Sequence, residues 1–318
     1  MYSGLIKGVS SGYWYSAGLC CLTTLNKWIR NFCASIVERG VMTSSAKTIL
    51  ITGCSTGIGY VTAHDLKQRG HRVIASARAL ADVERLKAEG FEAVQLDLSD
   101  STSIQTAVKA VLQLTDGKLD VLFNNGAFGQ PGAVEDLTRD VLRMQFETNF
   151  FGTHELTNLV LPVMRQQGQG RIIYNSSVLG LVALVYRGAY NASKFALEGL
   201  ADTLRLELYG TGITVSLIEP GPILSDFRKN SLALFKENID LNNSAHKATY
   251  ARMLERLEKE GAAVPFTLPA SAVSAKVIHA VEANRPKVHY YVTFPTYLFG
   301  FLKRILPAAW LDYILRKV

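Results

Sequence analysis

An apolar run followed by a glycine-rich turn and an amphipathic stretch constrains the fold of this chain most. The run is TILI at 48–51, the turn is TGCSTGIG at 52–59, and the stretch covers 60–69. Glycines let a turn approach a ligand closely, and a helix start offers free N–H groups to phosphate. The pattern predicts a dinucleotide site. Its spacing, Gly-x-x-x-Gly-x-Gly, departs from the common fingerprint, so an ordinary strand-to-helix loop is the alternative.

Buried-type apolar runs recur along the chain, separated by helical patterns. With 318 residues, 48% of them hydrophobic, the chain can bury one large core. Alternating strands and helices favour a parallel sheet with right-handed connections and helices on both faces. We predict an α/β fold with a single doubly wound sheet of about seven strands, whose ligands bind at the carboxyl ends. The expected strands are 48–53, 72–76, 93–96, 120–124, 171–176, 213–218 and 287–292.

An arginine follows the second predicted strand. Arg78 stands where a carboxylate would hydrogen-bond the ribose 2′-hydroxyl of NAD. An arginine can instead neutralise the 2′-phosphate of NADP. The sequence therefore favours NADP(H) over NAD(H), with a surface arginine at a strand end as the alternative.

Tyr190 and Lys194 lie four residues apart in a predicted helix, so they share one face. A tyrosine has a pKa of about 10, and a neighbouring cation favours the phenolate. The pair is thus suited to acid/base chemistry near neutral pH. Tyr-x-x-x-Lys also arises by chance on solvated helix faces, so the interpretation depends on the other motifs.

Further motifs follow in order. Asp97-Leu98 follows the third strand, and NNGA at 124–127 ends the fourth. Asn149 lies in a helical stretch over 141–163, and Ser177 precedes Tyr190 by thirteen residues. With the glycine turn and IEPGPI at 218–223, this series resembles the short-chain dehydrogenase/reductase family over residues 47–292. Within the family, GIG at 57–59, NFFG at 149–152 and IEPGPI at 218–223 look most similar to the motifs of bacterial aldehyde reductases and of retinol or hydroxysteroid dehydrogenases. One departure is Gly-Ala at 126–127, where the family usually has Ala-Gly.

The resemblance implies a Rossmann-like fold and a role for each motif. Tyr190 is expected to exchange a proton with the substrate, Lys194 to lower the pKa of Tyr190 and hold the nicotinamide ribose, and Ser177 to orient the carbonyl. Asn149 would hold a relay water through its backbone. The implied catalytic residues are Asn149, Ser177, Tyr190 and Lys194. The implied coenzyme-binding residues are Gly53, Ser55, Thr56, Gly57, Ile58, Gly59, Arg78, Asp97, Leu98, Asn125, Gly126, Tyr190, Lys194, Pro220, Gly221, Ile223 and Ser225.

Both ends of the chain differ from the central domain over residues 46–293. We expect residues 1–45 to be a disordered or loosely attached extension, or an over-long start before Met42. Their apolar stretch at 13–25 is too short to span a bilayer, which takes about 20 apolar residues. Residues 294–318 are rich in aromatic residues and dotted with Lys and Arg. We expect an amphipathic helical tail that caps the substrate pocket, lies on a membrane surface or packs on the core.

The formal charge of +7 comes from scattered basic residues without a recognition motif, so we predict no nucleic-acid partner. We also predict no metal site. Of the 4 cysteines only Cys54 lies in the domain, as a small packing residue, which fits a reducing cytoplasmic compartment. The resemblance implies a homodimer or homotetramer formed through the helices at 141–163 and 187–208.

The expected function is an NADP(H)-dependent oxidoreductase acting on the CH–OH group of a donor. Its substrate would be a lipophilic aldehyde or ketone, or the corresponding alcohol, because apolar residues gather at 179–185 and in the tail. The family resemblance also implies a mobile helical lid between Ser225 and Pro269. The alternatives are a non-catalytic NADP-binding regulator or a membrane-associated scaffold on the same fold. The complete set of Asn149, Ser177, Tyr190 and Lys194 favours the enzyme.

Overall fold

A computed structural model describes residues 46–259, 261–262 and 264–318. Residues 46–318 form one compact unit. The predictions made for the extension at 1–45 lie outside the described residues. Within the described part of the chain, no helix combines the length and hydropathy that crossing a bilayer requires.

The central sheet has seven strands, all parallel, in the order β3-β2-β1-β4-β5-β6-β9. The strand order reverses direction between β1 and β4, as in a doubly wound sheet, which confirms the predicted fold class. Parallel strands covered on both faces are expected to be continuously apolar, and β1 is buried along almost its whole length. The strands are β1 (Thr48–Ile51), β2 (Arg72–Ala77), β3 (Glu92–Gln95), β4 (Val121–Asn124), β5 (Gly170–Asn175), β6 (Ile213–Glu219) and β9 (His289–Tyr291).

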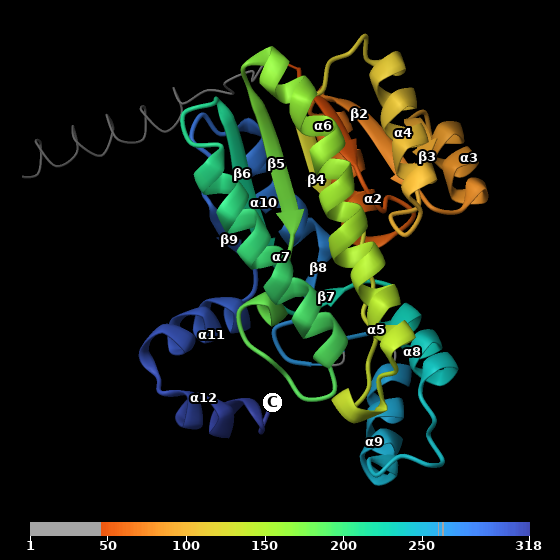
Figure 1. The fold of residues 1–318 in the computed structure, drawn as a ribbon, viewed down its shortest axis with the longest axis vertical. Coiled ribbons are helices and arrows are strands. Elements are labelled where there is room, and N and C mark those ends of the chain that lie inside the picture. The colour runs from red at the N-terminus through yellow and green to blue at the C-terminus, as the bar shows by residue number, and fades with distance from the viewer. Residues whose placement is uncertain (1–45, 260, 263) are drawn as a thin grey trace, which may run out of the picture. The chain divides into compact units, whose positions relative to one another are not determined.

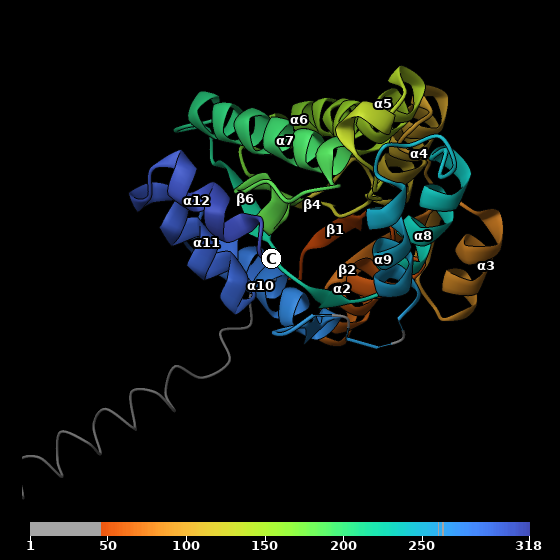
Figure 2. The ribbon, with the colours of Figure 1, turned by 90° about the horizontal axis from the view of Figure 1, so that it is seen from below.

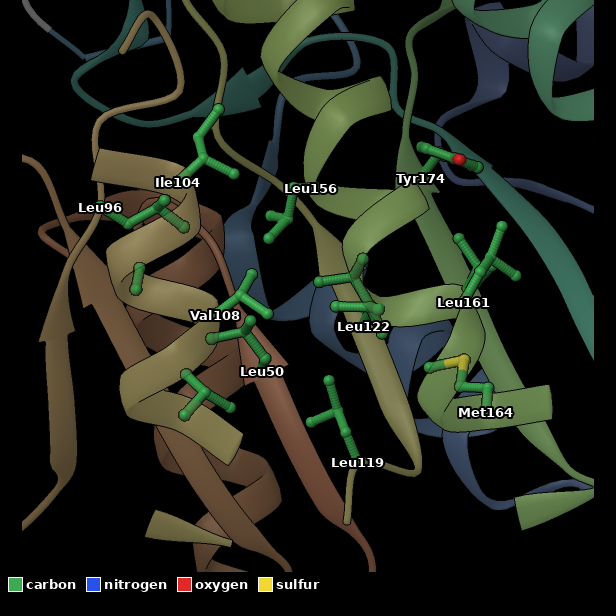
Figure 3. Packing of buried hydrophobic residues seen from close by; sticks show 14 of the residues in the cluster. Leu50, Leu96, Ile104, Val108, Leu119, Leu122, Leu156, Leu161, Met164 and Tyr174 are labelled. Carbon is green, nitrogen blue, oxygen red and sulfur yellow. The ribbon is translucent and has the colours of Figure 1, made fainter. Parts of the chain in front are cut away.

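Helices cover both faces of the sheet (Figures 1 and 2). On one face lie α4 (Ser101–Leu114), α6 (Thr153–Gln167) and α7 (Gly188–Glu207), packed on side chains such as Leu50 and Leu122 (Figure 3). On the other lie α2 (Gly57–Gln68), α3 (Leu80–Ala88) and α10 (Ala270–Glu282), packed on Ile49 and Ile51. Consecutive side chains of a strand point to opposite faces of the sheet, so neighbouring residues of β1 pack into different cores. Packing in these two cores fixes the positions of the strand ends, and the motifs lie at these ends.

The helix predicted at 141–163 is wrong as a continuous element. The structure has α5 (Arg139–Phe146), then a π-helical turn η2 (Glu147–Gly152), and then α6. A Cβ at Gly152 would lie 1.7 Å from the Leu98 carbonyl oxygen, so only glycine permits this close approach. The wider turn sits beside the predicted active site, where such turns are frequent. Asn149 lies within it and is buried.

After β6 the chain builds a separate layer over the carboxyl ends of the strands. Helices α8 (Phe227–Asn238) and α9 (Lys247–Glu258) pack together around Phe235 and Tyr250. Two short strands, β7 (Ile223–Leu224) and β8 (Leu268–Pro269), pair in parallel at its base. The helical content expected between Ser225 and Pro269 is confirmed, although α9 begins and ends three residues before the predicted span 250–261.

The tail forms two helices, α11 (Phe294–Ile305) and α12 (Ala308–Leu315), separated at Pro307. Phe299 and Leu315 pack against Val182 of the segment that follows β5. This contact matches the expectation that the tail packs on the core. The opposite side of the tail leaves large apolar side chains exposed, among them Phe301 and Trp310.

Candidate active site

A cleft of about 420 Å³ opens at the carboxyl ends of the strands. It is bounded by the glycine turn after β1, the ends of β4 and β5, the start of α7, and α8 and α9. Most predicted site residues line it: Gly53, Ser55, Thr56, Gly57, Ile58, Asn125, Gly126, Ser177, Tyr190, Lys194, Pro220, Gly221, Ile223 and Ser225. The structure therefore brings together motifs that lie up to 172 residues apart, from 53 to 225.

The glycine turn has the geometry of a phosphate cradle. Gly53 and Gly57 have φ of 68° and 62°, a region that favours glycine. A Cβ at Gly59 would lie 2.2 Å from the Gly53 carbonyl oxygen. Thr56 stands at the N-cap of α2, and its side chain makes no capping hydrogen bond. The N–H groups of the first helical turn are thus available to an anion.

Hydrogen bonds tie this turn to the end of β4. The Thr52 hydroxyl accepts from the Asn125 and Gly126 amides at 2.8 and 2.7 Å. The Asn125 side chain donates to the Thr52 and Gly53 carbonyls at 2.9 and 3.2 Å. Gly126, the predicted departure from the family pattern, has no positive φ and lies under Leu98, whose Cδ1 would be 2.9 Å from an added Cβ. The Gly-Ala order thus leaves room for Leu98.

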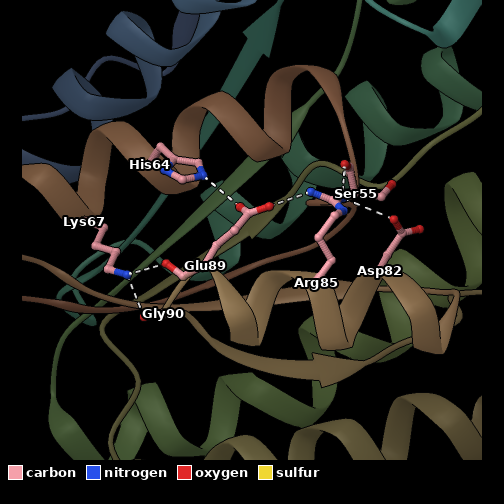
Figure 4. A network of polar contacts seen from close by, with 7 residues as sticks. All are labelled: Ser55, His64, Lys67, Asp82, Arg85, Glu89 and Gly90. Atoms are coloured by element: carbon pink, nitrogen blue, oxygen red, sulfur yellow. Dashed lines mark hydrogen bonds and ion pairs between the residues drawn. The ribbon is translucent and has the colours of Figure 1, made fainter.

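A polar network from α3 holds the outer side of the turn (Figure 4). The Arg85 guanidinium donates to the Ser55 carbonyl at 2.6 Å and forms ion pairs with Asp82 and Glu89 at 3.1 and 2.9 Å. Glu89 also contacts His64 of α2 at 3.2 Å. This network positions Ser55 from outside the cleft.

We expect Arg85→Ala to weaken coenzyme binding, because the Ser55 carbonyl loses the hydrogen bond from the Arg85 guanidinium (Figure 4). Arg85 is two-fifths exposed, so the rise in Kd is about threefold to tenfold. Fluorescence titration with NADPH measures it. Lys87→Ala is the control on the same helix, since Lys87 pairs only with exposed Glu84. An equal rise in the Kd for NADPH in both variants would show that the hydrogen bond from Arg85 to Ser55 does not support coenzyme binding.

The three predicted proton-handling residues converge in the cleft. Tyr190 and Lys194 lie on α7, and the Lys194 Nζ is 5.6 Å from the centre of the Tyr190 ring. Lys194 donates to the Asn175 carbonyl at the end of β5 at 2.6 Å. Ser177 follows β5, and its hydroxyl accepts from the Leu179 amide at 3.1 Å. Strand β5 and helix α7 therefore fix the three relative to one another.

Burial governs the charge of these groups. It raises the pKa of Tyr190 to about 12, while contact with the Ser177 hydroxyl acts in the opposite direction. It lowers the pKa of Lys194 to about 8, against the attraction of Glu198. The Tyr190 pKa thus moves opposite to the direction predicted from Lys194 alone, because the loss of hydration on burial disfavours the phenolate.

Asn149 lies beside the cleft and does not line it. Its side chain clamps Phe128, accepting from the amide at 3.2 Å and donating to the carbonyl at 2.9 Å. It also donates to Ser193 of α7 at 3.3 Å. The side chain therefore joins the π-helical turn to the loop after β4. The relay water predicted at its backbone stays a prediction.

Four other predicted residues also lie outside the cleft lining. Gly59 is buried within the turn, and Leu98 is buried with its side chain packed against Gly126. Asp97 lies two residues beyond β3, where its carboxylate accepts from the Ser99 amide at 2.9 Å. Arg78 is exposed beyond β2. Cys54 is fully buried, and burial raises its pKa to about 12, as expected for a packing residue.

A buried acidic network behind Lys194 was not predicted. Glu198 accepts from the Ser176 hydroxyl, and burial with neighbouring Glu219 raises its pKa to about 7. Glu219 in turn contacts His289 at 2.5 Å. The sequence signal was the position of Glu198 four residues after Lys194, on the same helix face. Its partners come from β6 and β9, which spacing alone does not bring together.

A sequence model described as short chain dehydrogenase matches residues 47–233, more than half of the chain. The chain belongs to the short-chain dehydrogenase/reductase family. The matched span contains the glycine turn, Asn149, Ser177, Tyr190 and Lys194. This confirms the family resemblance.

This short-chain dehydrogenase is similar to two curated relatives and to one solved structure. It is 43% identical to the uncharacterized oxidoreductase YbbO of Escherichia coli K12, over 85% of this chain and 94% of the relative. It is 34% identical to human 17-beta-hydroxysteroid dehydrogenase type 1, over 77% of each. Its fold matches an actinorhodin polyketide ketoreductase variant solved with NADPH, with TM-score 0.64, 27% identity, and 78% and 96% of the two chains covered. The protein is thus an oxidoreductase of the class that acts on CH–OH groups.

Proposed function

We propose that the protein is an NADP(H)-dependent reductase or dehydrogenase that interconverts a lipophilic carbonyl compound and its alcohol. The observation that carries this proposal is the convergence of Tyr190, Lys194 and Ser177 in a cleft whose other end is a glycine cradle. A proton donor and an oxygen-orienting hydroxyl are what a carbonyl reduction needs from the protein.

The residues of the cradle fit a dinucleotide. The positive φ of Gly53 and Gly57 and the uncapped start of α2 suit a pyrophosphate, while Asn125 and Ser225 border the inner part of the cleft. When bound, the nicotinamide supplies the hydride for reduction or accepts it in oxidation. Ser177 orients the carbonyl oxygen, and Tyr190 donates a proton to that oxygen or removes one from the alcohol. Lys194 places a positive charge beside the phenol and holds the ribose.

Arg78 supports the preference for NADP(H), because it is exposed directly after β2, where its charge is open to a phosphate. We expect Arg78→Ala to raise the KM for NADPH about tenfold by removing a charged contact to the 2′-phosphate. The KM for NADH is the internal control and changes by less than about twofold. Steady-state kinetics with both coenzymes measure this. If the KM values for NADPH and NADH rose by the same factor, Arg78 would not discriminate between the two coenzymes.

The substrate side of the cleft is largely apolar. Val178, Leu179 and Leu184 line it from the segment after β5, and Phe227, Leu257 and Val264 line it from the layer above. Apolar walls with a few polar groups are typical of sites for lipophilic molecules. The name of the related hydroxysteroid dehydrogenase supports the same class of substrate.

Turnover assays test the proposed function directly. Purified protein is incubated with NADPH or NADH and with aldehydes, ketones and steroids of graded size, and the absorbance of the reduced nicotinamide is followed. We expect NADPH-dependent reduction that improves with apolar size. A protein that binds NADPH tightly and turns over no carbonyl compound would favour the non-catalytic alternative.

The tail supports a second proposal, peripheral contact with a membrane. Phe301 and Trp310 are 59% and 69% exposed. Lys303 and Arg304 lie in the last turn of α11, and Arg316 and Lys317 follow α12. Apolar side chains flanked by basic ones favour an anionic lipid surface.

We expect the double variant Phe301→Glu/Trp310→Glu to bind anionic phosphatidylglycerol vesicles at least about tenfold more weakly, because it lacks the two apolar side chains that enter the lipid surface. Co-sedimentation measures this. Leu80→Glu, a 59% exposed site on α3, is the control and keeps wild-type binding. Vesicle binding that is unchanged in the double variant would end the membrane proposal.

The homodimer or homotetramer stays a proposal as well. The π-helical turn η2, helix α6 and helix α7 expose Phe151, Leu159 and Phe195, which an interface between copies would cover.

A further inference from the structure

Two arginines from different elements line the cleft. Arg187 is the N-cap residue of α7, and Arg256 belongs to α9. Burial lowers the pKa of Arg187, and the charge of Arg256 lowers it further. Like charges at close range in a partly buried site destabilise each other unless an anion is present.

The described residues provide no carboxylate for this pair. No described Asp or Glu comes within the 4.0 Å of a salt bridge from either guanidinium. Arg187 instead donates to the neighbouring Tyr186 carbonyl at 3.1 Å. Among the described cleft-lining residues, Asp226 is the single acid beside the cations Arg187, Lys194, Arg228 and Arg256. The electrostatic potential at this end of the cleft therefore favours an anion.

The backbone before Arg187 is held in an unusual conformation. Tyr186 has φ of 59°, which costs a non-glycine residue conformational energy. It is fixed by its hydroxyl contact with His246 at 3.2 Å and by edge packing on Tyr250. The layer formed by α8 and α9 thus holds the segment from which Arg187 enters the cleft.

Arg187 lies three residues before Tyr190, and both residues line the cleft. The glycine cradle for the coenzyme pyrophosphate belongs to the opposite wall, after β1. Guanidinium groups bind carboxylate and phosphate through paired N–H donors. From this geometry we infer that the substrate is an amphiphile whose anionic group, a carboxylate or a phosphate, binds Arg187 and Arg256 while its carbonyl faces Tyr190. This inference rests on the proposed function and names its substrate class.

The first test compares substrates. An ω-oxo fatty acid, its methyl ester and an ω-oxoalkyl phosphate, each of graded length, are reduced with NADPH. We expect kcat/KM to favour an anionic form over the ester by at least about tenfold, the value of a hydrogen bond to a charged group. Arg187→Met and Arg256→Met lower that ratio by about tenfold. Arg252→Met removes a charge from α9 outside the cleft and leaves the ratio unchanged. Equal rates for anions and ester in the wild-type protein would overturn the inference.

The second test measures binding without turnover. Calorimetric titration of the NADPH-bound protein with decanoate, decyl phosphate and decanol compares the anions with a neutral ligand. Tighter binding of one anion supports the inference and identifies carboxylate or phosphate, whereas decanol binding as tight as both anions would overturn it. This titration does not depend on the reduction of any carbonyl compound. A failure of the inference can therefore be distinguished from a failure of the proposed function. A tenfold or larger loss of NADPH affinity in Arg187→Met, about 1.4 kcal/mol, would assign the pair to the coenzyme and also overturn the inference.

Discussion

Tyr190→Phe is expected to reduce kcat by about 10³-fold while the protein still binds NADPH, because general acid/base catalysis contributes on this scale. The phenylalanine ring keeps the edge packing of Tyr190 on Phe227, whose centroid lies 5.4 Å away. The substitution therefore removes the hydroxyl and little else. Single-turnover kinetics and NADPH titration measure the two properties separately.

Tyr209→Phe provides the matched control. Tyr209 follows α7 and is 93% exposed, so its hydroxyl takes no part in the cleft. We expect wild-type kinetics from this variant. If Tyr190→Phe lost less than about tenfold in kcat, Tyr190 would not be the proton donor.

Gly59→Ala should break the coenzyme cradle. The added Cβ would lie 2.2 Å from the Gly53 carbonyl oxygen and 2.6 Å from the Asn125 side chain, so the turn must open. Forcing a methyl group into such a contact costs about 1–3 kcal/mol. We expect the Kd for NADPH to rise at least about tenfold and the Tm without coenzyme to fall.

The control for this substitution is Gly199→Ala. Gly199 lies in α7, with no atom within 4 Å of an added Cβ, so alanine should leave the Kd unchanged and favour the helix. Gly59→Ala with wild-type NADPH affinity would show that the turn can bind the dinucleotide in a wider form.

The sheet was predictable because its central strands, such as β1 and β4, are short apolar runs buried on both faces. All seven predicted strands overlap observed ones, and no end differs by more than two residues. The pair of β7 and β8 was missed, because two-residue strands leave no periodic signal. The π-helical turn at Asn149 was also missed, since its residues continue a helical pattern. Its cause is contact with the distant Leu98 carbonyl, which only the fold supplies.

The candidate site was predictable where its parts are local in sequence. Tyr190 and Lys194 share a helix face by spacing alone, and the glycine turn directly follows its strand. Arg187 and Arg256 come from elements that only the fold brings to one cleft. The proximity of Glu198 and Glu219 depends on the packing of α7 on β6. Such tertiary contacts also reversed the predicted direction of the Tyr190 pKa, because burial depends on the whole fold.

The layer of α8 and α9 is one continuous insertion, returned to the sheet through the small pair of β7 and β8. It supplies the outer wall of the cleft, while the proton-handling groups belong to α7 and to the segment after β5. Its core is completed by Ala133 and Tyr186, so a protein engineer who exchanges residues 226–267 between homologous enzymes must match these two contacts as well. The recipient would acquire a new range of substrates and retain its original chemistry.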